Sequence, residues 1–169
     1  MPQTQTATTK RKTASPDALA LRGKIAVANT KKVYQRFREI FYGDGFSTLR
    51  QRGARVQRPL WASTSTKNPQ YRDVMYVEEL IGPDTVNTLP LATLNGFRDH
   101  GRVRGDTVQE ELSTAEDRLR TISSLGIDLH AITEKLQVDG IASFASAYDR
   151  VLAALEKKRG NMMKARASA

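Results

Sequence analysis

The stretch RVQRPLWASTSTKNP, residues 55–69, decides how the rest of the chain is interpreted. Its apolar run Leu60-Trp61-Ala62 leads directly into four hydroxyl residues, 63–66, and then into Lys67. This order is typical of a buried strand whose C-terminal end opens onto a polar site. Small hydroxyls donate hydrogen bonds to an anion at short range, and a lysine adds a mobile positive charge. We therefore expect a strand over residues 56–63 with an anion-binding site at its end.

Composition places the chain among ordinary globular proteins. It has 169 residues, of which 39% are hydrophobic and 27% charged, which predicts one domain with a sizeable core. No apolar run is long enough to predict a membrane span. The chain has no cysteine, which excludes disulfides, thiolate metal sites and a cysteine nucleophile, and fits the cytoplasm.

The net charge of +9 is unevenly distributed. Residues 1–60 hold 13 Lys and Arg against 3 Asp and Glu, whereas residues 61–169 hold 14 against 15. A basic front can mark nucleic-acid binding, so a small basic nucleic-acid-binding or interaction protein is the alternative hypothesis. The ordinary interpretation is a solvated tail followed by one basic helix face.

The front of the chain predicts a disordered tail and then a long helix. Residues 1–14 are polar and basic without any apolar period, so we expect them to be disordered. Ser15-Pro16-Asp17 predicts a helix start, because a capping hydroxyl precedes a proline at the first helical position. We expect this helix to reach Tyr42. Its apolar spacing predicts a buried stripe of Ala26, Val33, Phe37, Ile40 and Phe41, with Lys24, Lys31, Lys32, Arg36 and Arg38 mostly off it.

The middle of the chain reads as a repeat of strand, helix and strand. A short connecting helix over 46–54 precedes the first strand, in which Pro59 is an objection because proline lacks a ladder donor. A helix should begin at Asn68-Pro69, and residues 85–89 should form a second strand. Two strands joined through a helix imply parallel pairing.

Beyond Pro90 only helices are predicted. We expect one over 91–100, one over 107–125, a short segment capped by Asp128, and a final helix over 139–158 that Gly160 stops. Residues 161–169 should form a frayed tail. The final helix has the clearest apolar stripe, made of Ile141, Phe144, Ala145, Tyr148, Val151, Leu152 and Leu155.

Other chemical candidates are weaker than the hydroxyl run. His100 and His130 are far apart and lack clustered carboxylates, so no metal site is expected. His100 should lie in the last turn of a helix, where positive charge is favourable. The neighbours Glu78 and Glu79 point in different directions on a helix, which favours surface salt bridges over acid and base catalysis.

Two stretches around the hydroxyl run carry a family resemblance. RVQRPLWASTSTKNPQYRDV, followed by YVEELIGPDTVNTLP, closely resembles the late barrel segments of bacterial transaldolases of the pentose phosphate pathway. The family usually has WASTGTKNP here, so Ser65 stands where glycine is expected. LRGKIAVANTKKVYQRFREIF resembles the outer helix before the seventh barrel strand, and LQVDGIASFASAYDRVLAAL is similar to the C-terminal helix. The resemblance runs from about Leu21 to Lys158, roughly the last third or more of the family's length.

The resemblance implies a fold and two site residues. The fold would be α/β, with the last two βα units of a (β/α)8 TIM barrel over residues 15–160, followed by C-terminal helices, and mostly helical by residue count. In the family, a serine at this strand end and a basic residue after it hold the sugar phosphate, which implies those roles for Ser63 and Lys67. Trp61 is expected to pack in the core.

The resemblance also implies a reaction. Transaldolases transfer a dihydroxyacetone unit from a ketose phosphate to an aldose phosphate through a Schiff base on a lysine, and they need no cofactor. That lysine and the proton-shuttling carboxylate belong to earlier strands, so we expect no catalytic residue in this chain and no activity from it alone. The missing strands could come from another chain, and self-association is a further expectation.

Overall fold

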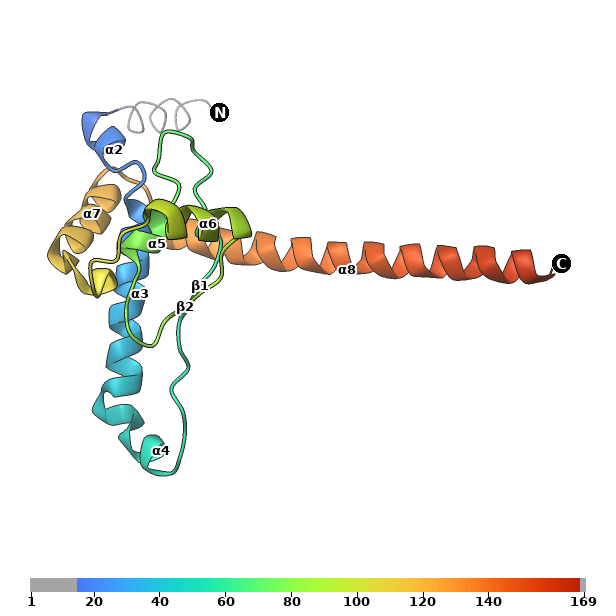
Figure 1. Ribbon diagram of the computed structural model, residues 1–169, viewed down its shortest axis with the longest axis horizontal. Coiled ribbons are helices and arrows are strands. Elements are labelled where there is room, and N and C mark those ends of the chain that lie inside the picture. Colours follow the sequence, from blue (N-terminus) through green and yellow to red (C-terminus); the bar gives the residue numbers. More distant parts are fainter. Residues whose placement is uncertain (1–14, 168–169) are drawn as a thin grey trace, which may run out of the picture. The chain divides into compact units, whose positions relative to one another are not determined.

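The computed structural model describes residues 15–167, which are mostly helical with one small sheet (Figure 1). The expected disorder of residues 1–14 lies outside this range. The chain divides into two compact units, Met1–Gly126 and Ile127–Ala169. The single domain expected over residues 15–160 stays a prediction.

The first helical region is broken where a continuous helix was expected. Helix α2 (Pro16–Ala20) starts as predicted, because the Ser15 side chain accepts a hydrogen bond from Ala18 N at 3.2 Å. Helix α3 (Ile25–Tyr42) begins only after a turn that contains Gly23 at φ +75°. The prediction of one helix from Ser15 to Tyr42 is therefore wrong, since this left-handed turn interrupts it.

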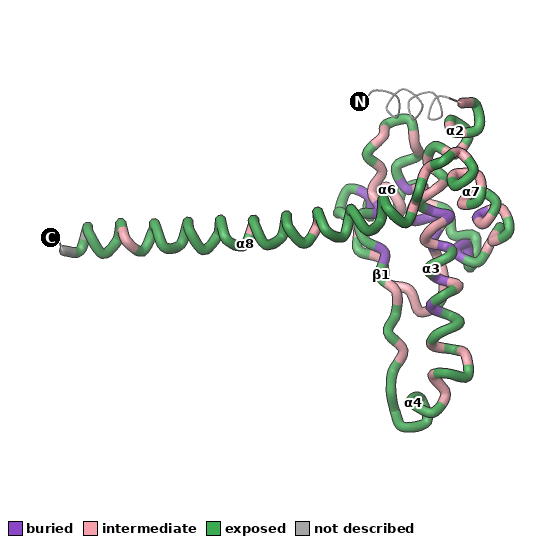
Figure 2. The backbone as a smooth tube through the Cα atoms, turned by 180° about the vertical axis from the view of Figure 1, so that it is seen from behind, coloured by how far each residue is buried: buried purple, intermediate pink, exposed green. Residues whose placement is uncertain are grey.

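The buried face of α3 also differs from the predicted stripe. Its buried residues are Val27, Ala28, Lys31, Tyr34 and Phe37. Of the five residues predicted for the buried stripe, only Phe37 is among them, and Val33 and Ile40 are each 45% exposed. The reason is that α3 packs against α7 (Leu112–Ser124) and the 3-10 turn η2 (Thr107–Gln109), which cover the neighbouring face. Figure 2 shows the buried positions gathered along α3 and the segments beside it.

The short elements after α3 match the expected connection. The turn η1 (Asp44–Phe46) leads into α4 (Ser47–Gln51), and Gly53 at φ +88° follows it. An extended segment then returns the chain to the sheet.

The sheet has the predicted parallel pairing but shorter strands. Strand β1 (Leu60–Trp61) pairs with β2 (Val86–Asn87), with Leu60 opposite Val86 and Trp61 opposite Asn87. Pro59 does not obstruct the ladder, because its carbonyl oxygen accepts from Val86 N at 3.0 Å and no donor is required of it. The predicted strands 56–63 and 85–89 are therefore correct in position and direction, but the observed strands are shorter.

The helices around the sheet are partly as predicted. Helix α5 (Met75–Glu79) starts later than Asn68, because residues 68–74 form turns. Helix α6 (Leu91–His100) has the predicted bounds and ends before Gly101. Helix α7 starts later than Thr107, because Glu111 at φ +51° separates it from η2.

The core of the first unit joins α3, the sheet and η2. Its buried members are Val27, Tyr34, Phe37, Trp61, Leu80 and Val108. Two charged residues of this unit, Lys31 and Glu78, are also buried, and each has a partner of opposite charge. The Lys31 amine donates to Glu110 O at 2.9 Å and lies 3.8 Å from Glu79, so its expected place off the buried stripe is wrong.

In the described residues, the second unit has one helix, α8 (Leu129–Ala167). Asp128 caps its start, since its side chain accepts from Ala131 N at 3.0 Å. The expectation of a short segment after Asp128 and a separate final helix from residue 139 is wrong, because one helix runs through both. The stop expected at Gly160 is wrong, because the helix continues to Ala167, and the frayed tail expected over residues 161–169 stays a prediction. A single glycine weakens a helix without having to end it. Over residues 15–167, no helix combines the length and apolar character that crossing a membrane requires.

Val108 offers a direct test of this core. It is fully buried, and a side chain added at Gly82 would collide with its Cγ1. Val108→Ala should lower the free energy of unfolding by about 1.5–3 kcal/mol, because two buried methyl groups are lost and a cavity is left. Val103→Ala is the matched control, since Val103 is 72% exposed and should change stability by less than about 0.5 kcal/mol. Equal effects in urea unfolding would contradict this packing.

Candidate functional site

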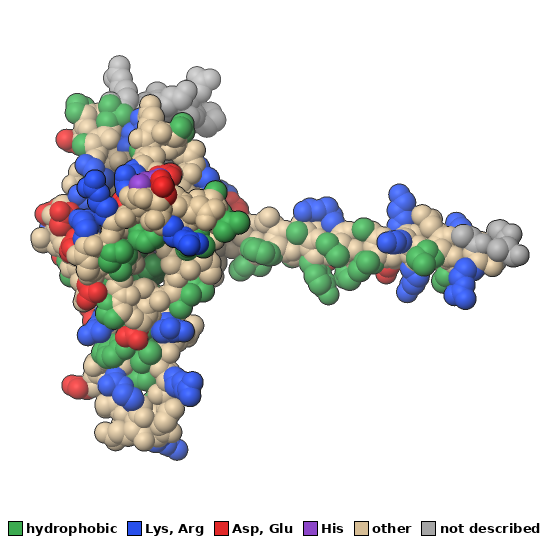
Figure 3. Space-filling view, in the orientation of Figure 1, with side chains coloured by type: hydrophobic (Ala, Val, Ile, Leu, Met, Phe, Trp, Pro, Cys, Tyr) green, Lys and Arg blue, Asp and Glu red, His purple; other side chains and the backbone are tan. Residues whose placement is uncertain are grey.

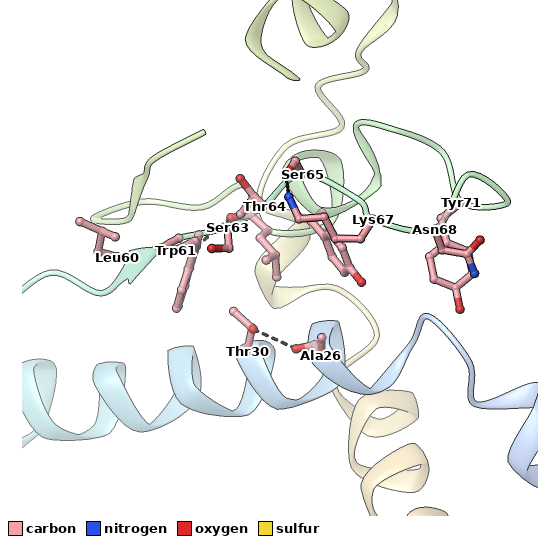
Figure 4. A pocket seen from close by; sticks show the side chains of 13 residues that line it. Ala26, Thr30, Leu60, Trp61, Ser63, Thr64, Ser65, Lys67, Asn68 and Tyr71 are labelled. Carbon is pink, nitrogen blue, oxygen red and sulfur yellow. Dashed lines mark hydrogen bonds between the residues drawn. The ribbon is translucent and has the colours of Figure 1, made fainter. Parts of the chain in front are cut away.

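A pocket of about 580 Å³ lies at the C-terminal end of β1. Its volume falls within the roughly 300–1,000 Å³ usual for small-molecule sites. One wall is the hydroxyl run that follows β1, and the other comes from α3, with Ala26 and Thr30 facing the run (Figure 4). The sequence prediction of a polar site at this strand end therefore coincides with a real cavity.

The hydroxyl run turns sharply as it leaves the strand. Ser63 has φ +58°, a left-handed conformation that is uncommon for a residue with a side chain. The next residue, Thr64, is 4% exposed, and its hydroxyl donates to Asn87 Oδ1 at 2.9 Å. Because Asn87 belongs to β2, this bond ties the turn after β1 to the neighbouring strand.

The two predicted phosphate-binding residues line the same pocket. Ser63 and Lys67 are both exposed there, and the Lys67 amine donates to Ser65 Oγ at 2.7 Å. Figure 4 shows the Lys67 side chain folded back toward Ser65. A serine hydroxyl and a lysine on one wall can bind an anion, and their assignment to a sugar phosphate stays a prediction.

Ser65 causes no strain in place of the family's glycine. The left-handed residue in this turn is Ser63, and Ser65 does not have a positive φ. The Ser65 hydroxyl instead holds the Lys67 amine.

Several pocket residues were missed by sequence reasoning. Thr30 and Ala26 lie one helical turn apart on α3, and Tyr71 and Tyr76 come from the segment that leads into α5 and from α5 itself. These residues belong to no motif, so the sequence gives no signal for them. Asn87, which lies outside the pocket and holds the turn through Thr64, could have been noticed only as an amide side chain within the second predicted strand.

Trp61 packs in the core, as expected. It is 8% exposed, and its indole nitrogen donates to Leu80 O at 3.2 Å. Both residues form part of the pocket's apolar floor.

A second group of polar residues lies between α5 and α6. Arg72 binds both carboxylate oxygens of Glu78 at 2.9 Å and donates to His100 O at 2.6 Å. Glu78 also accepts from Arg102 N at 2.9 Å. These bonds, led by that of Arg72, hold the pKa of Glu78 below its usual range. The expected salt-bridge role is correct for Glu78, but the residue is buried, not on the surface.

His100 lies in the last turn of α6, as predicted, between two carboxylates. Its Nε2 is 3.0 Å from Asp73 and its Nδ1 is 3.0 Å from Asp99. The Asp73 carboxylate, followed by that of Asp99, raises the pKa of His100. The group stabilises the C-terminal end of α6. Within residues 15–167, no cluster of His, Asp and Glu is suited to hold a metal ion.

Comparisons with known proteins all point to one enzyme family. Residues 3–155 match the family described as Transaldolase/Fructose-6-phosphate aldolase. The chain is 45% identical over 141 residues to Transaldolase 1 of Streptomyces coelicolor, covering 83% of this chain and 37% of that protein. It is 42% identical over 145 residues to the transaldolase of Mycolicibacterium smegmatis, covering 86% of this chain and 39% of that protein. The chain thus spans less than half the length of these relatives.

The carboxylates beside His100 predict a pH dependence. Because its folded-state pKa is raised above the unfolded value of about 6.5, protonated His100 adds stability that is fully present below that value and lost as pH rises through the folded pKa. NMR titration should show Asp73→Asn lowering the pKa of His100 more than Asp99→Asn does. The reverse order, or no change in either variant, would contradict the assigned contacts.

Proposed function

Because this chain belongs to the transaldolase/fructose-6-phosphate aldolase family, we propose that it carries the phosphate-binding part of a transaldolase site. Ser63 and Lys67 would hold the phosphate of a sugar phosphate. The observation that carries the proposal is that both side chains line one pocket at the end of a parallel strand.

The local contacts support an anion at this position. The Ser63 hydroxyl can donate to a phosphate oxygen without giving up a bond within the turn. The Lys67 amine now donates to Ser65 Oγ, and a phosphate would offer it a stronger, charged acceptor. The bond from Thr64 to Asn87 holds the backbone of the turn while Lys67 changes partner.

Under this proposal, the residues that act in the reaction are divided between this chain and other parts of the family's sequence. This chain would bind the phosphate end of the ketose. The lysine that forms the imine and the carboxylate that moves protons would come from family sequence outside the matched segment. No cofactor would be needed, because the lysine imine itself accepts the electrons of the broken carbon–carbon bond.

The fold is part of the same proposal. Strands β1 and β2 would be the last two strands of a (β/α)8 barrel, with α3 and α5 on its outside. In the described residues each strand has one partner, so two sheet edges are open to further strands. About eight strands are needed for side chains to fill a barrel interior. The partner of this chain would therefore be the preceding part of a transaldolase barrel.

The alternative of nucleic-acid binding gains no support. The family match assigns the segment with α3 to an enzyme family, and several basic residues of α3 already have partners. Lys32 pairs with Glu116 at 2.8 Å, and Arg36 with Glu39 at 2.8 Å.

Lys67 can be tested in a complete barrel. The matched segment of this chain replaces its counterpart in the Streptomyces coelicolor relative, and Lys67→Ala is introduced. Sugar-phosphate binding should weaken by about 1.5–3 kcal/mol, the value typical of a charged hydrogen bond. The effect should appear as a raised KM for the ketose phosphate.

Lys135→Ala in the same chimera is the control, because Lys135 is exposed and pairs only locally with Asp139 at 2.8 Å. It removes the same charge far along the sequence from the pocket. Equal KM values for both variants would remove Lys67 from the site.

Borohydride trapping tests the division of the reaction. This chain alone, incubated with fructose 6-phosphate and borohydride, should show no covalent adduct by mass spectrometry, because its pocket lysine is assigned to phosphate binding. A complete transaldolase treated in parallel should be modified. A stoichiometric adduct on Lys67, or on any other lysine, would show that this chain carries the imine-forming step.

A further inference from the structure

The pocket at the end of β1 has two sides of different chemistry. The hydroxyl run and Lys67 form one side, and α3 with the floor beneath it forms the other (Figure 4). The volume of about 580 Å³ is that of a site for a drug-sized ligand, which is much larger than the phosphate group that Ser63 and Lys67 would hold. The part of the pocket toward α3 therefore has room for a second portion of a ligand.

The side toward α3 offers mainly carbon surface, because its polar groups are largely in use. The Thr30 hydroxyl already donates to Ala26 O at 2.9 Å. The indole nitrogen of Trp61 already donates to Leu80 O at 3.2 Å. A sugar placed on this side would leave hydroxyl groups without partners, which is costly. An apolar group placed there would instead gain free energy by leaving water.

Two tyrosine rings make this side suitable for a flat, aromatic group. Tyr71 and Tyr76 both line the pocket, and each is half-buried, so that part of its ring stays open. The Tyr71 ring lies against the turn before α3, where a Cβ at Gly23 would be only 3.1 Å from its Cζ. The Tyr76 ring packs against the core of the first unit. Aromatic rings attract one another in offset-stacked and edge-to-face arrangements.

The surface of the first unit shows a similar combination of side chains. Figure 3 shows hydrophobic side chains exposed around the sheet, with Lys and Arg side chains near them. Ala26 of α3, which lines the pocket, is itself exposed. A ligand with an anionic end and an apolar body covers both kinds of surface, whereas a free phosphate ion would leave the apolar part in water.

We propose that this pocket also binds phosphate monoesters of aromatic alcohols. The phosphate oxygens would accept hydrogen bonds from Ser63 and Lys67, and the aromatic ring would lie between the hydroxyl run and α3. Only the phosphate end of this ligand rests on the proposed function. In a complete barrel such an ester would compete with the sugar phosphate, because both need the same two side chains.

Binding to the full chain tests the aromatic end, with phenyl phosphate and methyl phosphate as probes. The two esters carry the same phosphate group and differ in the ring. Isothermal titration calorimetry should give a dissociation constant for phenyl phosphate that is lower by about tenfold or more, because only this ester removes a ring from water. Equal dissociation constants for the two esters would overturn the proposal.

Filling the pocket from α3 tests where the ring lies. Ala26→Phe places a side-chain ring on the wall that faces the hydroxyl run, and the preference for phenyl phosphate should be lost because the space is taken. Thr30→Phe fills the same space one helical turn further along and should act alike. Val33→Phe is the matched control, since Val33 of α3 is 45% exposed and does not line the pocket. A preference that survives both fillings, or that Val33→Phe also abolishes, would overturn the proposal.

Lys67→Ala separates a failure of this proposal from a failure of the proposed function. It should weaken the binding of both esters by a similar factor, because both use the same amine. If neither ester binds, or if Lys67→Ala weakens neither, the phosphate end is wrong and the proposed function is overturned with it. If both esters bind equally and Lys67→Ala weakens both, only the aromatic end is overturned.

Discussion

The carbonyl oxygens of Pro59 and Trp61 accept hydrogen bonds from Val86 N and Thr88 N, at 3.0 and 2.9 Å. This short parallel ladder fixes the place of everything around the pocket. It aligns the ends of β1 and β2, so that Thr64 after one strand reaches Asn87 on the other. It also sets the Trp61 indole against Leu80. The hydroxyl run can therefore form a pocket wall, because the strand before it is held by this ladder and by the hydrogen bond from Trp61 to Leu80 O.

Burial of charged residues gives the first unit much of its specificity. Lys31 is 2% exposed and Glu78 is 8% exposed, and a buried charge is tolerated only when it is well paired. Lys31 of α3 reaches Glu110 O and Glu79, and Arg72 binds the Glu78 carboxylate through Nε and Nη2 of its guanidinium. The contacts of Lys31 connect α3 to segments distant in sequence, and they hold the Lys31 face of α3 inward.

Apolar surface left exposed in the first unit agrees with the proposed place of this chain in a barrel. Val33 and Ile40 of α3 are 45% exposed, and Leu60 of β1 is 53% exposed. Side chains of this kind on a sheet edge and a helix face are what further strands and helices would cover.

The sequence alone determined those features that depend on neighbouring residues. Ser15 capped its helix, Gly101 followed the end of α6, and the order of strand, helix and strand gave parallel pairing. The hydroxyl run after Leu60 and Trp61 located the pocket, and Ser63 and Lys67 both line it. Tertiary structure decided the rest, because burial depends on what packs against a residue. Periodicity predicted Val33 and Ile40 for the core of α3, yet α7 and η2 cover Lys31 and Tyr34 instead. Thr30 joined the pocket, and Asn87 came within reach of Thr64, only through the folding of distant segments onto β1.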